Sequence, residues 1–423
     1  MDVTAPIRRH PRGGDVESGS ERESTDLTGV KELFEDEESI PEVSVVMPCL
    51  NEIDTLGTCI KKTIQFFFES QIKGEIVVAD NGSTDGSQEI ASRMGARIVS
   101  IEAKGYGNAL MGGIAAARGR YIIMGDADDS YDFGDLEKYI AKLREGYDLV
   151  QGCRLPWGGG RIMPGAMPFL HRWWGNPMFT AMARRWFGAP IHDVYCGLRG
   201  FTKEMYNRLD LRCTGMEFAT EMIIKASLYS KNIAEVPITL HPDGRKAHPP
   251  HLKTYRDGWR TLRFFLLYSP RSLFLVPGAL LIAVSVLGYG LALPGVKLHG
   301  VTFDAHTLLF ASLAALCGYQ SILFALFSKT FAISEGLLPE DPRLTRFFQV
   351  MNLERGLILA TLALVIGLVL LGVAVNSWRL VGFGALDYAK TMRLVVPGAT
   401  LTALGFQTIL SSFFVSMLGM RRK

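Results

Sequence analysis

Four long apolar runs after residue 271 constrain the fold of this chain more than any other feature. Each run is about long enough to cross roughly 30 Å of hydrocarbon, and each is nearly free of charge, which argues against a buried helix of a soluble domain. The runs are Leu273 to Leu293, Leu308 to Phe327, Leu357 to Val375 and Leu394 to Leu418. The 423-residue chain is therefore expected to join a polar domain at 41–271 to a membrane domain of four transmembrane helices at 272–423.

The distribution of Lys and Arg predicts how these helices are oriented. An even number of spans leaves both chain ends on one side, and cytoplasmic loops carry an excess of positive charge. The cations on that side are Arg256, Arg260, Arg263, Arg271, Arg343, Arg346, Arg355, Arg421, Arg422 and Lys423. The opposite loop carries Arg379, Lys390 and Arg393, which weakens the bias without reversing it. We expect a multi-pass membrane protein with the polar domain and both termini in the cytoplasm.

Composition excludes several other classes of protein. The 45 Lys and Arg residues nearly balance the 42 Asp and Glu residues, so no basic field gathers nucleic acid and no nucleic-acid partner is expected. The six cysteines are scattered, which argues against a structural zinc site or a disulfide framework. Residues 1–40 are polar and lack an apolar core, so they are expected to form a disordered tail rather than a signal peptide.

Short apolar strands alternate with helical segments through the first part of the polar domain. The expected strands are Val43 to Met47, Glu75 to Ala79, Arg97 to Ser100 and Tyr121 to Met124. Uniformly apolar strands in this order predict a Rossmann-like α/β domain with a mostly parallel sheet covered on both faces. Ligands of such sheets bind at the carboxyl ends of the strands. The polar residues at those ends are Asn51, Glu52, Asp80, Lys104 and Asp126.

Asp126 and Asp128 follow the last of these strands and suit a divalent cation. In an extended segment residues i and i+2 point the same way, so both carboxylates can reach one ion while Ala127 packs behind them. Mg²⁺ or Mn²⁺ held in this way takes further ligands from phosphate oxygens, which suits a nucleotide diphosphate leaving group. A solvated acidic loop is the alternative, because acidic turns are common.

Two further loops fit a nucleotide. Asp80 can accept hydrogen bonds from a base N–H or a ribose hydroxyl, and backbone N–H groups around Gly105 and Gly107 can approach phosphate without a Cβ in the way. Each loop has a plainer interpretation. The residues after Asp80 also form an ordinary turn and helix cap, and Gly105-x-Gly107 lacks the third glycine of a dinucleotide fingerprint.

Four short motifs occur in order along the polar domain: Pro48-Cys49-Leu50-Asn51-Glu52, Asp80-Asn81-Gly82-Ser83-Thr84-Asp85-Gly86, Lys104-Gly105-Tyr106-Gly107-Asn108-Ala109 and Asp126-Ala127-Asp128. Taken together, they resemble the glycosyltransferases of family 2, which have the GT-A fold. More narrowly, they resemble polyprenyl-phosphate hexose synthases of the dolichol-phosphate mannose or glucose synthase type. The resemblance covers roughly Glu42 to Arg271. Mannose synthases often carry Leu where this chain has Asp129, which leaves the sugar open.

The resemblance implies residues on the donor side and on the acceptor side. The donor residues would be Pro48, Asn51, Glu52, Asp80, Lys104, Gly105 and Asp126, with Asp126 and Asp128 holding the metal and the diphosphate. Arg245 would belong to a basic loop, 243–248, that covers the diphosphate.

On the acceptor side, Asp193 and Arg199 would lie beside the reacting phosphate, and Arg154 would bind the lipid phosphate. A guanidinium suits a phosphate because it makes two parallel charge-assisted hydrogen bonds, although a solvated surface residue is the plainer interpretation of Arg154. The resemblance also places an acidic residue near the sugar. Glu217 is favoured, with helix capping as the alternative.

Residues 161–188 are rich in Pro, Trp and Arg. This composition suits helices that lie among lipid headgroups, and the alternative is a core helix whose arginines extend to solvent. Self-association through the membrane domain is left open.

The sequence therefore predicts an inverting transfer of a hexose from a UDP-glucose or GDP-mannose type donor to a polyprenyl monophosphate. Asp128, Asp193, Arg199 and Glu217 are the expected catalytic residues. Two alternatives remain: transfer to another membrane lipid, or a nucleotide-sugar-binding membrane protein without catalysis. The chain shows no Gln-x-x-Arg-Trp segment of the kind typical of processive polysaccharide synthases.

Overall fold

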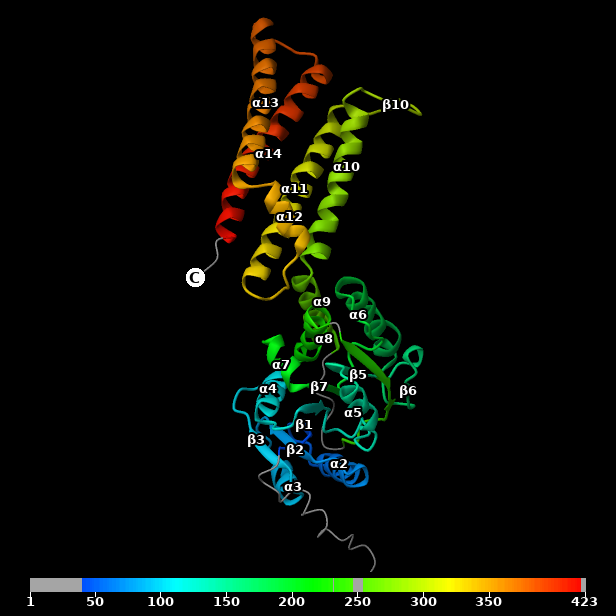
Figure 1. Cartoon of the computed structure of the whole chain (residues 1–423). Helices are drawn as coiled ribbons and strands as arrows, with labels where there is room; N and C mark the ends of the chain where they lie inside the picture. The colour runs from blue at the N-terminus through cyan, green and yellow to red at the C-terminus, as the bar shows by residue number, and fades with distance from the viewer. Residues whose placement is uncertain (1–39, 231, 246–253, 420–423) are drawn as a thin grey trace, which may run out of the picture.

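A computed structural model describes residues 40–230, 232–245 and 254–419. It contains an α/β domain and, beyond it, a bundle of long helices (Figure 1). The expectations for residues 1–39, and for Lys246 to His248 of the basic loop, lie outside the described residues.

A seven-stranded sheet forms the centre of the α/β domain, in the order β3-β2-β1-β4-β7-β5-β8. The strands are β1 (Val43–Cys49), β2 (Gly74–Asp80), β3 (Arg97–Ser100), β4 (Tyr121–Met124), β5 (Leu149–Cys153), β7 (Arg199–Thr202) and β8 (Ile233–Pro237). Strands β3, β2, β1 and β4 run parallel, and β5 is parallel to β8. Strand β7 runs antiparallel between β4 and β5. The mostly parallel sheet predicted from the sequence is confirmed, and the carboxyl ends of β1, β2 and β4 meet at one edge.

Helices cover both faces of the sheet, as the uniformly apolar strands predict. They are α2 (Leu56–Ser70), α3 (Ser87–Arg93), α4 (Tyr106–Ala116), α5 (Glu137–Arg144), α7 (Lys203–Leu209) and α8 (Glu217–Tyr229). One apolar core includes residues of α2, α3 and α5, and the other includes residues of α4, α7 and α8. Val45 packs into the first core and Val46 into the second, because successive side chains of a strand point to opposite faces. Helix α2 begins at Leu56, after a loop and turn formed by residues 51–55.

Residues 161–188 fold as one short strand and one helical segment. Strand β6 (Arg161–Ile162) pairs with β9 (Thr239–Leu240), and the chain then runs through η2 (His171–Gly175), α6 (Asn176–Met182) and η3 (Ala183–Phe187). The helical face with Phe179 and Phe187 is buried, whereas Trp173 and Trp174 on the other face are 52% and 69% exposed. One face of the helical segment is therefore buried in the domain, and the other face is exposed.

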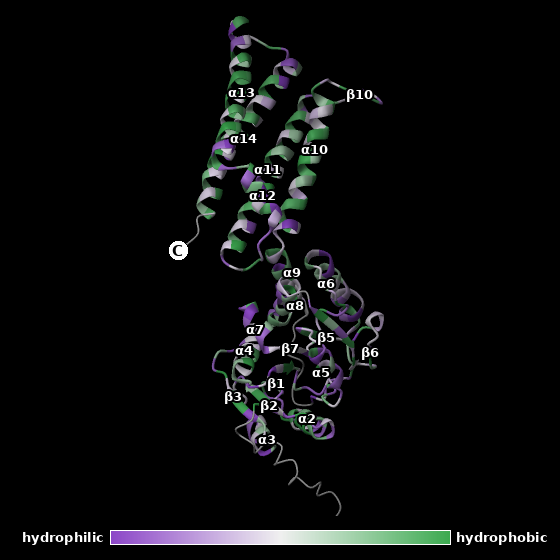
Figure 2. Cartoon of the chain, in the orientation of Figure 1, coloured by the Kyte–Doolittle hydropathy of each residue, from purple (hydrophilic) through white to green (hydrophobic). Residues whose placement is uncertain are grey.

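The second part of the structure contains four helical segments long and apolar enough to cross a membrane, at Arg271–Ala292, Ala305–Ser334, Leu353–Leu380 and Tyr388–Leu418. The elements are α9 (Thr254–Tyr268), η4 (Arg271–Leu275), α10 (Val276–Ala292), β10 (Lys297–Leu298), β11 (Val301–Thr302), α11 (Ala305–Ser334), α12 (Pro342–Val350), α13 (Leu353–Leu380) and α14 (Tyr388–Leu418). Helices α10 and α11 form one hairpin, and α13 and α14 form the other (Figure 1). Hydrophobic residues dominate these hairpins, whereas the α/β domain is mixed in colour (Figure 2).

Glycines allow the helices of the bundle to approach closely. A Cβ on Gly318 would lie 2.8 Å from the carbonyl oxygen of Gly278, and a Cβ on Gly405 would lie 2.7 Å from that of Ala360. Small residues at such positions are a common means of packing helices in lipid. The four apolar segments predicted from hydropathy are thus confirmed as four candidate membrane helices.

Candidate active site

The loops that follow β1 and β2 hold each other in place. The backbone N–H of Asn51 donates to Ser83 Oγ at 2.9 Å, and the N–H of Thr84 donates to Asn51 Oδ1 at 2.9 Å. The N–H of Glu52 donates to Ser87 Oγ at 3.0 Å. Asn51 has a φ of 60°, a left-handed conformation that Asn tolerates better than most residues. Asn51 and Glu52 are therefore fixed at the carboxyl edge of the sheet.

Asp80 ends β2 and organises its own loop. Its buried carboxylate accepts the N–H of Gly82 at 2.9 Å, the N–H of Ser83 at 3.1 Å and Nε2 of Gln88 at 2.7 Å. Pro48 lies one residue before the end of the adjacent strand β1. The turn interpretation of this motif is confirmed, and contact of Asp80 with a base or ribose stays a prediction.

The glycines of the third motif admit protein backbone. Lys104 Nζ donates to the carbonyl oxygen of Asn81 at 2.5 Å, and the N–H of Gly105 donates to Asn81 Oδ1 at 2.8 Å. A Cβ on Gly105 or Gly107 would lie within 2.4 Å of backbone oxygens in the segment 213–215. The sequence predicted that a phosphate would approach the backbone here. The structure fills it with a loop of the protein, which sets the position of α4.

This close approach makes Gly107→Ala a test of the loop packing. The added methyl group meets backbone atoms, which cannot move aside as a flexible side chain would, so we expect a loss of about 1–3 kcal/mol in stability. The matched control is Gly258→Ala, whose Cβ would meet nothing within 4 Å, and it should leave stability unchanged or slightly higher. Thermal unfolding of both purified variants measures the difference, and equal melting temperatures would contradict the packing.

The two carboxylates after β4 lie in one cluster, as their i, i+2 spacing predicts. Asp126 accepts a hydrogen bond from the hydroxyl of Tyr106 at 2.9 Å. Asp128 Oδ1 accepts the N–H of Ser130 at 3.1 Å and its hydroxyl at 2.6 Å. Ala127 is buried behind them. Tyr106 received no role from the sequence, although it lies inside the third motif, because a tyrosine between two glycines has no distinctive chemistry of its own.

Arg245 bridges this cluster to Glu52. Its Nε and Nη2 donate to the two oxygens of Glu52 at 2.9 and 2.7 Å, and its Nη1 lies 3.1 Å from Asp128 Oδ2. Glu52 is buried, and the Arg245 side chain is 11% exposed. The structure therefore brings together Glu52, Asp128 and Arg245, which are up to 193 positions apart. The carboxylates of Glu52 and Asp128 share one guanidinium at this edge of the sheet.

The electrostatics of the cluster fit a divalent cation. Burial, and then the negative charge of Asp128, raise the pKa of Asp126 to about 6, although Tyr106 and Arg245 act in the opposite direction. Among the described residues there is no group of three or more His, Cys, Asp or Glu side chains that could hold a metal by itself. Mg²⁺ is commonly bound through one or two carboxylates together with substrate phosphates, and Asp126 and Asp128 match that pattern.

Arg154 and Asp193 form a buried ion pair. Arg154 Nε lies 2.7 Å from Asp193 Oδ2, and Nη2 lies 2.9 Å from Oδ1. Asp193 is fully buried and also accepts Nδ2 of Asn176 at 2.7 Å. Burial alone would raise the pKa of Asp193, but Arg154 and the hydrogen bonds outweigh burial and lower it. The surface interpretation of Arg154 is wrong, since the side chain is held inside the domain.

Arg199 is also fully buried, at the start of β7. Its Nη2 and Nη1 donate to the carbonyl oxygens of Cys196 and Ala219, each at 2.6 Å, and its Nε has no partner among the described residues. Burial lowers the pKa of the guanidinium, and the nearby groups that oppose this include Tyr106 and Asp126. Arg199 therefore lies close to the carboxylate cluster and away from solvent.

Glu217 begins α8 and lies 4.0 Å from Arg260 Nε. One turn later, Glu221 is fully buried and organises the loop that meets Gly105 and Gly107. It accepts the N–H of Cys213 at 2.8 Å. No role for Glu221 was predicted from the sequence. Its spacing of one helical turn from Glu217 was the signal that could have identified it.

Comparison with known proteins identifies the family. Residues 44–210 match the family described as Glycosyl transferase family 2, and residues 326–419 match the Glycosyltransferase family 2 C-terminal transmembrane region. Over 388 residues the chain is 38% identical to the low-salt glycan biosynthesis hexosyltransferase Agl6 of Haloferax volcanii. This alignment covers 92% of this chain and 91% of that protein. The chain belongs to glycosyltransferase family 2.

Two other matches involve the catalytic domain of this family 2 glycosyltransferase. The chain is 32% identical over 203 residues to a dolichyl-phosphate hexose transferase of H. volcanii. This alignment covers 48% of this chain and 84% of that protein. A crystal structure of glucosyl-3-phosphoglycerate synthase from Mycobacterium tuberculosis matches with a TM-score of 0.42 and 22% identity, over 58% of this chain and 85% of that one.

The matched family 2 region contains most of the candidate site. Glu52, Asp126, Asp128, Arg154 and Asp193 lie within residues 44–210. Glu217 and Arg245 lie beyond that region, so their assignment depends on the geometry described above. The resemblance of the four sequence motifs to this family is confirmed.

Proposed function

We propose that this family 2 glycosyltransferase transfers a hexose from a nucleotide diphosphate sugar to a polyprenyl monophosphate at the cytoplasmic face of the membrane. The observation that carries the proposal is the cluster of Glu52, Asp126, Asp128 and Arg245 at the carboxyl ends of β1 and β4. A divalent cation held by these carboxylates would, together with Arg245, neutralise charge on a departing diphosphate. The named hexosyltransferase relatives and the membrane domain support a lipid acceptor.

In this mechanism Asp126 and Asp128 would hold Mg²⁺ or Mn²⁺, which when bound neutralises charge on the leaving diphosphate. Tyr106 holds the Asp126 carboxylate by its hydrogen bond, and the Ser130 hydroxyl and N–H hold Asp128. When the donor binds, the Arg245 guanidinium leaves the Asp128 carboxylate and binds a diphosphate oxygen. Asn51, Pro48, Asp80, Lys104 and Gly105 are assigned to the nucleoside side of the same edge, and Glu217 to the sugar.

The acceptor phosphate attacks the anomeric carbon and inverts its configuration. Its second pKa is about 6, so it is largely dianionic at neutral pH and needs little help from a general base. Because Asp193 holds two nitrogens of Arg154, we assign Asp193 a positioning role and assign Nη1 of Arg154 to the phosphate. Arg199 is fully buried near Asp126 and contributes positive charge from the interior of the domain.

The experiment incubates the purified full-length protein with polyprenyl phosphate and a panel of UDP- and GDP-hexoses, with and without a chelator. We expect one donor to yield a prenyl-phosphate hexose, detected by mass spectrometry, and the chelator to abolish the product. Parallel reactions contain diacylglycerol as acceptor. A product from diacylglycerol alone would assign the enzyme to another lipid acceptor, and nucleotide-sugar binding without any glycolipid would favour a non-catalytic protein.

The contact between Arg245 and Asp128 leads to a prediction about metal binding. In the absence of donor, the Arg245 guanidinium and a divalent cation compete for Asp128, so Arg245→Ala should bind Mn²⁺ more tightly, by about ten-fold. With nucleotide diphosphate present the order should reverse, because the lost guanidinium no longer binds the diphosphate. Electron paramagnetic resonance of free Mn²⁺ measures both affinities. Unchanged Mn²⁺ affinity without nucleotide would contradict the competition.

A further inference from the structure

A cationic segment lies on the membrane-facing end of the catalytic domain. Residues 161–188 contain four arginines and no aspartate or glutamate. Helix α6 in this segment lies at the same end of the domain as α9, which leads into the first membrane helix (Figure 1). Three exposed aromatic side chains accompany the arginines: Phe169, Trp173 and Trp174. Tryptophans beside cations are typical of the headgroup layer of a bilayer.

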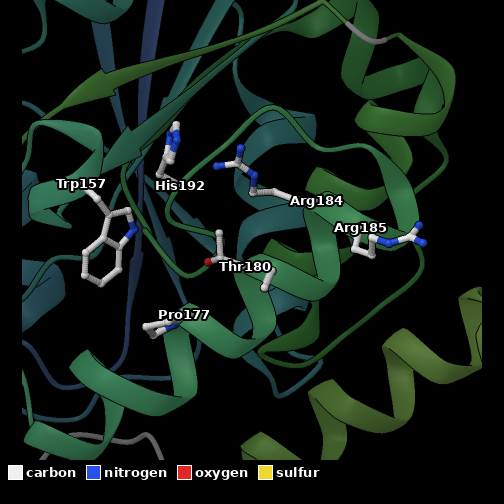
Figure 3. A pocket seen from close by; sticks show the side chains of 7 residues that line it. Trp157, Pro177, Thr180, Arg184, Arg185 and His192 are labelled. Carbon is white, nitrogen blue, oxygen red and sulfur yellow. The ribbon is translucent and has the colours of Figure 1, made fainter.

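A cavity of about 500 Å³ opens between this segment and two neighbouring loops. It is lined by Trp157, Pro177, Thr180, Ala181, Arg184, Arg185 and His192. Figure 3 shows the guanidinium of Arg184 extending toward the space between His192 and Thr180, whereas Arg185 extends away from that space. Trp157 forms the opposite wall. The cavity therefore combines an apolar wall with a basic side.

The polar floor of the cavity is held rigidly by the fold. Thr180 Oγ1 donates to Asn176 Oδ1 at 3.1 Å and accepts the N–H of Val194 at 3.2 Å. The Nδ1 atom of His192 lies 2.7 Å from a carboxylate oxygen of Glu235. The Arg184 side chain, in contrast, makes no hydrogen bond or ion pair with any residue in the described ranges, 40–230, 232–245 and 254–419. A preformed floor with an unpaired guanidinium at its edge is suited to an anion.

We propose that this cavity binds the phosphate of an anionic membrane phospholipid that does not take part in the reaction. Arg184 would pair with the phosphate, with the His192 imidazole beside it, and the Trp157 and Ala181 wall would cover the glycerol and first methylene groups. Basic pockets on the cytoplasmic side of membrane proteins recognise lipid headgroups in this way.

The occupant is assigned as a phospholipid rather than the acceptor because the residues assigned to the donor, the metal and the acceptor phosphate do not line the cavity, although its lining residue His192 directly precedes Asp193. The carboxylates Asp126 and Asp128 do not line it, and neither does Arg154 or Arg245. A phosphate bound at Arg184 would therefore lack contact with the groups that hold the donor. Its effect would be to anchor α6 at a fixed depth in the headgroup layer.

The test measures lipid binding to the full-length protein by native mass spectrometry, with phosphatidylglycerol and phosphatidylcholine titrated separately. We expect tighter binding of phosphatidylglycerol, weakened about ten-fold by Arg184→Ala and less by Arg184→Lys. The matched control is Lys61→Ala, which removes the same charge from an exposed position on α2, at the opposite end of the domain (Figure 1). It should bind phosphatidylglycerol as the wild type does.

Three results would overturn the proposal. The first is equal binding of the two phospholipids, and the second is phosphatidylglycerol binding that survives Arg184→Ala and Arg184→Glu. The third is one-for-one displacement of phosphatidylglycerol by polyprenyl phosphate, which would assign the cavity to the acceptor. Because Arg184 is exposed and forms no hydrogen bond or ion pair with the described residues, the variants should melt at the wild-type temperature, and this melt is recorded with each titration.

Discussion

Asp128→Ala should lower hexose transfer by about a thousand-fold or more while the protein still inserts into the membrane. In the proposed mechanism Asp128 would hold the cation that neutralises the leaving diphosphate, and loss of a group that stabilises developing charge typically costs about a hundred- to a thousand-fold in rate. Among the described residues, the membrane helices lie beyond the α/β domain that carries this loop (Figure 1). Asp128→Asn keeps the shape of the side chain and removes its charge, so it should also be inactive.

The measurement is the rate of glycolipid formation at saturating donor, with Mn²⁺ binding to the same preparations as a second readout. Asp129→Asn is the matched control, since Asp129 is the next residue and its carboxylate instead pairs with Lys62 Nζ at 2.8 Å. Asp129 has a φ of 59°, which Asn tolerates, so the backbone of the loop should be kept. Retained turnover in Asp128→Ala, or equal losses in the Asp128 and Asp129 variants, would exclude the assigned role.

Asp193→Ala should destabilise the catalytic domain by about 3–5 kcal/mol, because it leaves the buried guanidinium of Arg154 without its partner. For a domain of this size we expect the melting temperature to fall by roughly 10 °C. Glu42→Ala is the matched control. It breaks a bidentate pair with Arg144 that is largely exposed, and exposed pairs contribute about 0–1 kcal/mol.

A double variant separates stability from activity at this pair. Replacing both members, as in Asp193→Asn with Arg154→Met, removes the uncompensated charge and should recover much of the lost stability. It should not recover hexose transfer, because the Arg154 guanidinium is assigned to the acceptor phosphate. Thermal melts and transfer rates of Asp193→Asn, Arg154→Met and the double variant form a complete cycle. Full activity in the double variant would exclude that assignment, and additive losses of stability would contradict the buried pair.

The acid dependence of stability gives a further check on the same pair. The folded-state pKa of Asp193 is lowered, so the pair contributes its full stability above the unfolded pKa near 3.8. This contribution is lost as the pH falls from that value through the folded pKa. The melting temperature of the wild type should therefore fall more steeply with acid than that of Asp193→Asn, and parallel curves would contradict the lowered pKa.

The sequence by itself determined the four long apolar helices, the parallel strands and the position of the polar residues at their ends. These features follow from local patterns: the length of an apolar run, the period of a strand, and the chemistry of an Asp-x-Asp segment after a strand. The family followed from the order of four short motifs. The sequence also placed Asp126 and Asp128 in one cluster, since their spacing fixes their relative direction.

Only the tertiary structure decided which charges are paired. Arg154 looked like a ligand for phosphate or a solvated residue, and the structure shows that Asp193, 39 positions away, holds two of its nitrogens inside the domain. Arg245 meets Glu52 across 193 positions, and Gly105 and Gly107 face backbone where a phosphate was expected. The physical reason is that the type of a residue determines which kinds of group it can contact, but not which residue supplies that contact. The partner is set by how distant segments pack, and buried charges must find one or be excluded from the core.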